Sequence, residues 1–398
     1  MNRDAESIVS AGYPLGFRAA SGERPSDVLA GGTGDITMRV EARTVGGHQK
    51  EALVTEGDGG DAWRLVSDEG PNLKGTDLAP FPLAFFNAAM HADFLQRALA
   101  IGRLHGVAFD SLAAALDNYY TFSGSFFKGT GKGTADPVTV RVAAGSSAPP
   151  ERVRRVLGAA MAASPVHAAF ATPLVNVFAL YVNGRRCPVK RVAASTSADA
   201  VDPFLVHRKA PAPLAGAEAS EPIITRLDPD PNDERPKLIA PEGFVPILIR
   251  GTGEVVDPAG VASATVLPAS PGARFRLLAD ARPAPRRAPT PLALAAAGVA
   301  FCYMTQLSRY VEHRKHKVHG IRVVQTNGFS VSGRADDLSL RGGVAPFETH
   351  VFLNADEPDD LMQTLLEIAE NTCYLHAALR SELPGRVEAA LNGAALSV

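Results

Sequence analysis

The feature that most constrains the fold of this chain is an internal repeat with a spacing of 209 residues. The Pro-x-Pro-Leu-Ala pattern at residues 80–84 recurs at 289–293, and the hexapeptide at 164–169 (SPVHAA) is matched by CYLHAA at 373–378. Because two separate motifs share one spacing, we interpret the chain as a duplication. A length of 398 residues is also more than one hydrophobic core usually serves, so two domains are expected.

Each half shows the same order of predicted elements, in which strands precede a long apolar helix and further strands precede a second helix. Strands are predicted at 36–43, 51–55, 63–66, 118–127, 138–143, 245–250, 262–267, 274–278, 320–326 and 349–353, and helices at 82–105, 150–170, 291–313 and 358–379. This pattern predicts an α+β fold with antiparallel sheets around long buried central helices. The predicted boundaries are a flexible segment 1–35, a first domain 36–190, a proline-rich connector 191–243 and a second domain 244–398.

Composition and charge exclude several classes of function. The net charge is −2 and the basic residues are scattered, which argues against a nucleic-acid partner. The N-terminus lacks the pattern of a secretory signal, and the longest apolar run, 291–304, is shorter than the roughly 20 residues that span a bilayer. A soluble cytoplasmic protein with no membrane partner is expected. Three cysteines exclude a disulfide framework.

Two of these cysteines lie on predicted helices: Cys302 follows the proline-led start of the central helix, and Cys373 begins the sequence Cys-Tyr-Leu-His. Together with the entry sequence 67–71 (SDEGP) of the first half, these residues make the chain resemble the OsmC and organic-hydroperoxide-resistance superfamily, over roughly 36–190 and 244–395. Members of that superfamily form intertwined dimers with paired cysteines at the interface. The resemblance therefore implies two tandem OsmC-like domains that form an intramolecular pseudo-dimer.

The resemblance also implies the site residues. In the second half these are Cys302, Cys373 and His376, with Cys302 as the thiolate that attacks an O–O bond and Cys373 as the resolving thiol. The alternative interpretation of Cys302, in an Ala- and Val-rich helix, is a small buried hydrophobic residue.

In the first half the corresponding positions are Asp93, Ser164 and His167. A carboxylate and a hydroxyl cannot form a disulfide, so only one redox site is expected. Asp93 is either exposed by rotation of its helix or belongs to a polar pocket with Ser164 and His167, which share a helix face and suit acid–base or hydrolytic chemistry.

One departure from the family pattern weakens the peroxidase interpretation. The family's peroxidases have a Glu beside the proline at the start of the central helix, where it orients an Arg that stabilises the thiolate. Here that position is Leu292, and the candidate cations Arg43 and Arg250 stand in no matching motif. Without such a pair, little thiolate and weak activity are expected near neutral pH.

Other motifs predict no cofactor and no metal. His313, His316 and His319 have helical spacing, but three basic residues stand between them. The glycine-rich stretch 129–134 lacks the spacing of a phosphate-binding loop and predicts a hairpin turn. Cys187 is expected to be a free surface thiol.

Three functions follow as hypotheses. The leading one is a thiol-dependent enzyme that reduces an organic hydroperoxide or a related apolar electrophile. The alternatives are a non-redox hydrolase or lyase that uses the recruited inter-domain pocket, and a catalytically silent small-molecule-binding protein. The expected partners are a small apolar or amphipathic substrate, a thiol reductant and a further copy of the chain in a homo-oligomer.

Overall fold

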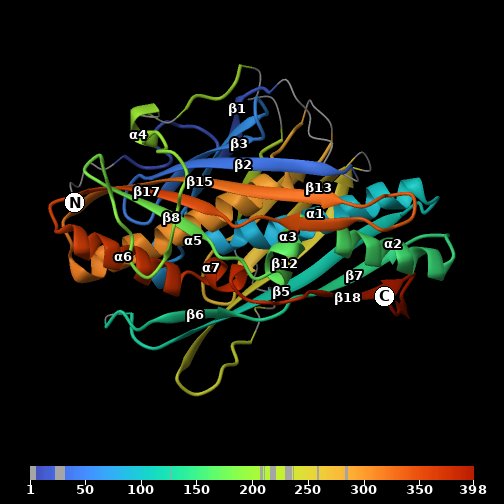
Figure 1. Ribbon diagram of the computed structural model, residues 1–398. Helices are drawn as coiled ribbons and strands as arrows, with labels where there is room; N and C mark the ends of the chain where they lie inside the picture. Colours follow the sequence, from blue (N-terminus) through green and yellow to red (C-terminus); the bar gives the residue numbers. More distant parts are fainter. Residues whose placement is uncertain are drawn as a thin grey trace.

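Two mixed sheets enclose a pair of long helices, α1 (Pro82–Leu104) and α5 (Pro291–Arg314), as Figure 1 shows. The computed structural model describes residues 6–22, 32–126, 128–206, 209, 211–215, 221–228, 235, 237–257, 260–282 and 286–398. Helix α1 packs on one sheet, α5 packs on the other, and the two helices pack on each other. The predicted α+β fold with buried central helices is therefore confirmed.

The strands fall into two sheets of matching order. The first sheet runs β1-β4-β3-β2-β15-β17-β8-β10 with β9 and β16 at its margin, and the second runs β11-β14-β13-β12-β5-β7-β18-β19 with β6 at its margin. The bounds are β1 Gly16–Ala20, β2 Gly34–Thr44, β3 Lys50–Glu56, β4 Ala62–Ser67, β5 Ser111–Ser123, β6 Lys132–Ala135, β7 Thr139–Gly145, β8 Val177–Val182, β9 Arg185–Cys187, β10 Ala193–Ala194, β11 Ile224–Leu227, β12 Phe244–Asp257, β13 Val261–Pro268, β14 Arg274–Asp280, β15 Val318–Ser332, β16 Arg341–Val344, β17 Glu348–Ala355, β18 Arg386–Leu391 and β19 Ala394–Leu396.

The sheets correct one part of the fold prediction, because they are not purely antiparallel. Strand β8 runs parallel to both β17 and β10, and β18 runs parallel to β7. Strands β8 and β18 follow the second helix of each half, and each joins the sheet opposite to the one that holds the strand before that helix. The parallel pairs β8–β17 and β18–β7 therefore form between the two halves of the chain.

Each sheet combines strands from both halves of the chain. Strand β2 of the first half pairs with β15 of the second, and β12 of the second half pairs with β5 of the first, both in long antiparallel registers. The predicted pseudo-dimer is therefore intertwined, and a boundary drawn along the sequence does not separate two independent sheets.

The repeat of 209 residues extends to elements that lie outside the two motifs that revealed it. Strand β6 begins at Lys132 and β16 at Arg341; β8 begins at Val177 and β18 at Arg386. Both pairs differ by 209 positions and have equal lengths. The two halves thus share one chain path, so a residue in one half has a definite counterpart in the other.

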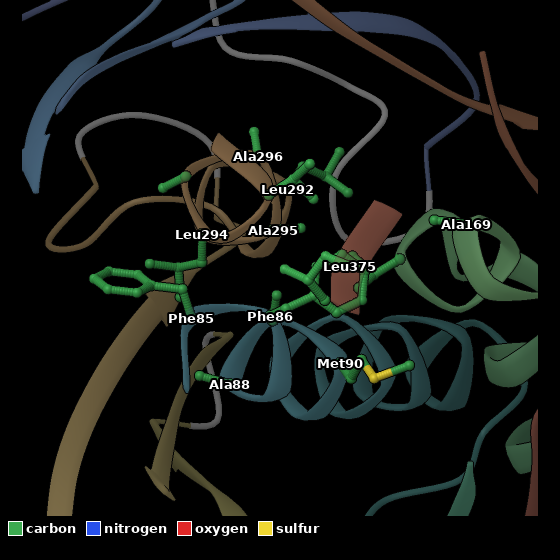
Figure 2. Close-up of a cluster of buried hydrophobic side chains, with 14 of the residues drawn as sticks. Phe85, Phe86, Ala88, Met90, Ala169, Leu292, Leu294, Ala295, Ala296 and Leu375 are labelled. Atoms are coloured by element: carbon green, nitrogen blue, oxygen red, sulfur yellow. The ribbon is translucent and has the colours of Figure 1, made fainter. Parts of the chain in front are cut away.

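The central helices approach closely where they cross. A Cβ atom on Gly298 would lie 3.1 Å from the backbone nitrogen of Phe86, so only glycine permits this approach. The rings of Phe85 and Phe301 meet with centroids 5.4 Å apart, and Figure 2 shows Phe85, Phe86 and Leu292 in the shared apolar cluster. This contact aligns Asp93 of α1 and Cys302 of α5 on either side of the pseudo-symmetric interface.

Helix α5 is long and apolar enough to span a membrane by length and composition alone, with a mean hydropathy of 1.3 over its most apolar window. It is longer than the apolar run 291–304 had indicated. However, 94% of that window is buried inside the protein. Its apolar character is therefore accounted for by its place at the centre of the core.

The predicted helices 150–170 and 358–379 are wrong in one respect, because each is interrupted. The first consists of α2 (Pro150–Ala163) and α3 (Pro165–Ala171), and the second of α6 (Asp359–Thr372) and α7 (Tyr374–Leu379). At the breaks, Ser164 and Cys373 have extended backbone angles. Proline disfavours a helical residue before it, which explains the break at Ser164 but not at Cys373, where tyrosine follows.

The structure also differs from the expectation for the terminal and connecting segments. The predicted flexible segment 1–35 contains β1, which pairs with β4. The proline-rich connector 191–243 contains β10, the short helix α4 (Pro203–Val206) and β11, and β11 extends the second sheet beside β14. A one-turn 3-10 helix at Pro71–Leu73 lies in the loop before α1. Most of the acidic run 228–234 lies outside the described residues.

Candidate active site

The structure brings together the two cysteines of the second half. The sulfur of Cys302 on α5 lies 3.3 Å from the sulfur of Cys373, which stands between α6 and α7. Cys373 is fully buried, whereas Cys302 keeps 3% of its surface exposed. Both are free thiols. The contact is close enough for Cys373 to donate its proton toward Cys302, which makes the Cys302 sulfur the acceptor of the pair.

His376 completes this group from the first turn of α7. Its Nδ1 atom lies 3.2 Å from the Cys373 sulfur, and its ring packs against Tyr303 and Phe178 with centroids 5.0 and 5.6 Å away. Burial, with a smaller contribution from Arg380, lowers the pKa of His376 to about 3. The imidazole is therefore neutral near pH 7, and one of its nitrogens can accept a hydrogen bond.

Burial has the opposite effect on the inner thiol. It raises the pKa of Cys373 well above the ordinary value, and the hydrogen bond to Cys302 raises it further. Cys373 is thus held as a thiol in the reduced protein. Of the two sulfurs, Cys302 is the one placed to react first.

Cys302 lies in the wall of a small cavity of about 70 Å³. The lining is mostly apolar and comes from both halves: the loop before α1, the start of α1, strand β12 and helix α5. Its residues are Glu69, Gly70, Asn72, Leu73, Asp77, Phe81, Pro82, Leu83, Ile247, Ile249, Pro268, Ser270, Cys302, Thr305, Gln306 and Tyr374. A molecule in this cavity would reach the Cys302 sulfur while Cys373 stays behind it.

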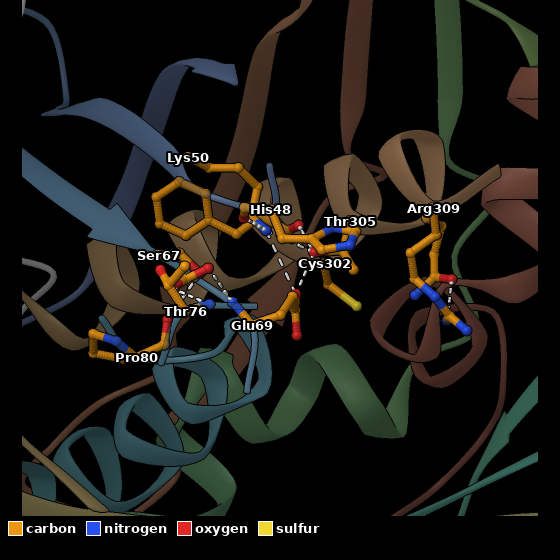
Figure 3. Close-up of polar contacts among 12 residues, drawn as sticks. His48, Lys50, Ser67, Glu69, Thr76, Pro80, Cys302, Thr305 and Arg309 are labelled. Carbon is orange, nitrogen blue, oxygen red and sulfur yellow. Dashed lines mark hydrogen bonds and ion pairs between the residues drawn. The ribbon is translucent and has the colours of Figure 1, made fainter. Parts of the chain in front are cut away.

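A buried ion pair from the first half lies beside Cys302. Lys50 on β3 donates to the backbone oxygen of His48 at 2.7 Å and to Thr305 Oγ1 at 2.9 Å, and its Nζ is 3.5 Å from Glu69 Oε1. The Thr305 hydroxyl in turn contacts Glu69 Oε1 at 2.5 Å. Figure 3 shows Lys50, Glu69 and Thr305 gathered around Cys302. Because Thr305 follows Cys302 on α5, this network links the two halves at the thiol.

Burial and neighbouring charges shift the pKa of Lys50 in opposite directions. Burial lowers the pKa of Lys50, while Glu69 and a negative charge on Cys302 each raise it. A lysine and a glutamate therefore stand beside Cys302, neither of them at the position of Leu292.

The sequence offered Arg43 and Arg250 as candidate cations and no carboxylate at position 292. Leu292 is fully buried in the core of α5. Arg43 pairs with Glu51 and Glu6, and Arg250 pairs with Asp117, so neither takes part in the network around Cys302. No motif in the sequence marked Lys50 or Glu69, although Glu69 belongs to the entry sequence 67–71 that carried the family resemblance.

The counterpart site in the first half is a closed polar cluster. Asp93 Oδ1 accepts from Arg97 Nε at 2.8 Å, and Asp93 Oδ2 contacts Ser164 Oγ at 2.5 Å. Ser164 Oγ lies 2.9 Å from His167 Nδ1. All four side chains are almost completely buried. Of the two alternatives for Asp93, exposure is wrong, and the structure brings Asp93 together with Ser164 and His167 as the other alternative expected. The spacing of four residues to Arg97 was the sequence signal for its further partner.

The order of contacts in this cluster does not favour hydrolysis. The hydroxyl of Ser164 lies between the carboxylate and the imidazole, whereas an activated serine requires an imidazole that is itself oriented by a third group. Burial lowers the pKa of His167 to about 4, so its imidazole is neutral. The cluster consists of the Asp93–Arg97 ion pair and the neutral side chains of Ser164 and His167. We interpret it as a structural group that replaces the two thiols.

The remaining candidates lie apart from this chemistry. Cys187 is buried, at 4% exposure, and its thiol donates to the backbone oxygen of Arg185, so the surface-thiol prediction is wrong. His316 and His319 face Glu357 and Asp356. Within the described ranges, no group of three or more His, Cys, Asp or Glu side chains could hold a metal ion.

Cys302 in the central helix α5 and Cys373 at the break between α6 and α7 form a pair of thiols at the interface of two intertwined α+β repeats. Residues 284–388 match the family of OsmC-like proteins, and both cysteines lie within the matched segment. The matched segment lies entirely within the second half of the chain.

The comparison with solved structures found an OsmC-like hydroperoxide resistance protein from Jannaschia sp. CCS1. The chain is 26% identical to it over 33% of this chain and 83% of that protein, with a TM-score of 0.21. No curated protein matches the chain.

Proposed function

We propose that this protein is a thiol-dependent enzyme that reduces an organic hydroperoxide or a related apolar electrophile through Cys302 and Cys373. The observation that carries the proposal is the position of the Cys302 sulfur, in the wall of an apolar cavity and 3.3 Å from a second thiol. The match of residues 284–388 to the family of OsmC-like proteins supports the same chemistry.

The first step takes place at Cys302. Its thiolate attacks the terminal oxygen of the hydroperoxide, an S–O bond forms, the O–O bond breaks, and the alkoxide leaves as an alcohol after it takes up a proton. The sulfur is oxidised by two electrons to a sulfenic acid as the hydroperoxide is reduced. The apolar cavity excludes water and favours an organic rather than an ionic substrate at the reacting end.

The second step involves Cys373 and His376. The Cys373 thiol attacks the Cys302 sulfur, an S–S bond forms, and the sulfenic oxygen takes up the thiol proton and leaves as water, while His376 Nδ1 accepts a hydrogen bond that orients the Cys373 thiol. The contact of 3.2 Å between His376 Nδ1 and the Cys373 sulfur supports this role. An external thiol reductant then converts the disulfide back to two thiols and becomes a disulfide itself.

Lys50 and Glu69 prepare Cys302 for the first step. The ammonium group of Lys50 supplies positive charge that favours the thiolate. Glu69 raises the pKa of Lys50 and so keeps that charge present, although its own negative charge offsets part of the effect. Glu69 also lines the cavity, where its carboxylate can accept a hydrogen bond from the O–H group of a hydroperoxide.

Thiol titration under denaturing conditions tests the proposal. One equivalent of cumene hydroperoxide should remove two of the three thiols of the wild type. The Cys302→Ser variant should lose none, and Cys373→Ser should lose one and retain a sulfenic acid that dimedone traps. The control, Cys187→Ser, should still lose two.

Retention of all three thiols in the wild type would refute redox use of the pair. The protein would then act as a binding protein or through non-redox chemistry. Loss of thiols that persists in Cys302→Ser would show that another cysteine reacts first.

A further inference from the structure

A larger groove that opens toward the surface adjoins the cavity at Cys302. The groove has a volume of about 340 Å³, compared with about 70 Å³ for the cavity. The two share walls formed by Asn72, Leu73, Ile247, Pro268, Ser270 and Tyr374. An inner space of this size holds only a reacting group, whereas the groove reaches the size of small-molecule sites.

Most of the groove surface is apolar. Phe122, Leu238, Val245 and Leu248 line it in addition to the shared residues. Val245 and Leu238 are 60% and 48% exposed, so apolar surface extends to the solvent at the groove mouth. Exposed apolar surface beside a cavity is typical of a binding site.

Arg309 places one positive charge in this groove. Among the lining residues within the described part of the chain, it alone is charged. Its guanidinium lies 4.7 Å from the centre of the Phe126 ring, and its Nη1 donates to Gln306 Oε1 at 3.0 Å. Within the same described ranges, no carboxylate pairs with it. The guanidinium is therefore held in place while donors remain for a ligand.

The carboxylates of the inner cavity are already occupied. Glu69 faces Lys50, and Asp77 accepts from Arg226 at 3.1 Å and from the backbone nitrogen of Ala273 at 2.9 Å. The counterpart of Arg309 in the first half, 209 positions earlier, is Ala100. The positive charge thus accompanies the half that carries the thiols.

We propose that Arg309 binds the carboxylate of an elongated amphipathic substrate, whose apolar body lies in the groove and whose reacting group reaches Cys302. This inference rests on the proposed function for the identity of the reacting group, but the binding of the anion does not require any reaction. Arginine binds carboxylates through paired hydrogen bonds, which makes a carboxylate the fitting anion.

Calorimetric titration of the full-length Cys302→Ser protein tests this proposal without redox chemistry. The probes are octanoate and octan-1-ol, which share an apolar chain and differ in charge. Adding Arg309→Gln should weaken octanoate binding by about tenfold, the effect of losing a charged hydrogen bond, and leave octan-1-ol binding unchanged. Arg309→Lys should retain most of the octanoate affinity. The matched control is Arg155→Gln, an exposed arginine on α2 outside the groove.

Three outcomes would overturn the proposal: no octanoate binding to the starting protein, equal octanoate affinity with and without Arg309, or parallel loss of both probes in Arg309→Gln. Thiol oxidation measured separately on the wild type stays informative in each case. A protein that oxidises its thiols but shows no anion preference would retain the proposed function and lose this inference; the reverse result would retain the anion site and remove the redox chemistry.

Discussion

Replacing Glu69 with glutamine removes one charge from the pair beside Cys302 and keeps the shape of the side chain. Lys50 is 1% and Glu69 7% exposed in their side chains, so neither group can exchange its partner for bulk water. In the variant, the ammonium group of Lys50 keeps hydrogen bonds to Thr305 and to the backbone of His48, but it faces no carboxylate at 3.5 Å.

The distance between Lys50 and Glu69 determines how much stability the substitution removes. At 3.5 Å and an effective dielectric constant of about 20, the attraction between the two charges is about 5 kcal/mol. Lys50 can release its proton in the variant, and the amide still accepts a hydrogen bond, so the expected loss of unfolding free energy at pH 7 is about 3 kcal/mol.

The loss should depend on pH in a defined direction. Burial already lowers the pKa of Lys50 in the folded protein, and removal of Glu69 lowers it further. Between the folded and unfolded pKa values the unfolded chain binds more protons, so stability rises with pH in that window. In Glu69→Gln this pH window extends to lower pH. The difference in unfolding free energy between the variant and the wild type should therefore shrink as the pH rises from 7 to 9.

Urea unfolding at both pH values measures this difference. The matched control is Glu151→Gln, which removes an exposed ion pair with Arg154 and should leave stability unchanged at either pH. At neutral pH, Glu69→Gln should also oxidise its thiols more slowly. A difference below about 1 kcal/mol, or one that is equal at pH 7 and pH 9, would contradict a charged Lys50–Glu69 pair.

Three further predictions concern the histidines and the counterpart site. His376→Asn should leave the first oxidation step intact but slow disulfide formation, so that dimedone traps a sulfenic acid as in Cys373→Ser; equal disulfide yields would exclude a role of His376 in orienting the Cys373 thiol. Asp93→Ala should reduce the unfolding free energy by about 3 kcal/mol, because Arg97 is left buried without its carboxylate, with no change in thiol loss by titration. Burial lowers the pKa values of three histidines, His91, His167 and His376. The unfolding free energy should therefore fall as the pH drops from about 6.5 to about 4, because the unfolded chain binds protons that these buried neutral imidazoles do not. A flat profile in urea unfolding over this range would contradict these assignments.

Local patterns in the sequence were sufficient for the architecture of each half. Proline at the first helical position and a long apolar run predicted both central helices within a residue or two. The repeat of 209 residues aligned Cys302 with Asp93 and Cys373 with Ser164. These features are readable because helix periodicity, helix starts and repeat spacing depend on residues that are near each other in the chain or that recur in register.

The pairing between the halves and the surroundings of Cys302 were decided by the tertiary structure. Lys50 and Thr305 are 255 positions apart, and they meet only because β3 of the first half packs against α5 of the second. A buried lysine has no sequence pattern that distinguishes it from an exposed one, since its environment is set by whichever element packs over it. For the same reason, the position of Leu292 gave no information about Glu69, which comes from the opposite half of the chain and lines the same cavity as Cys302.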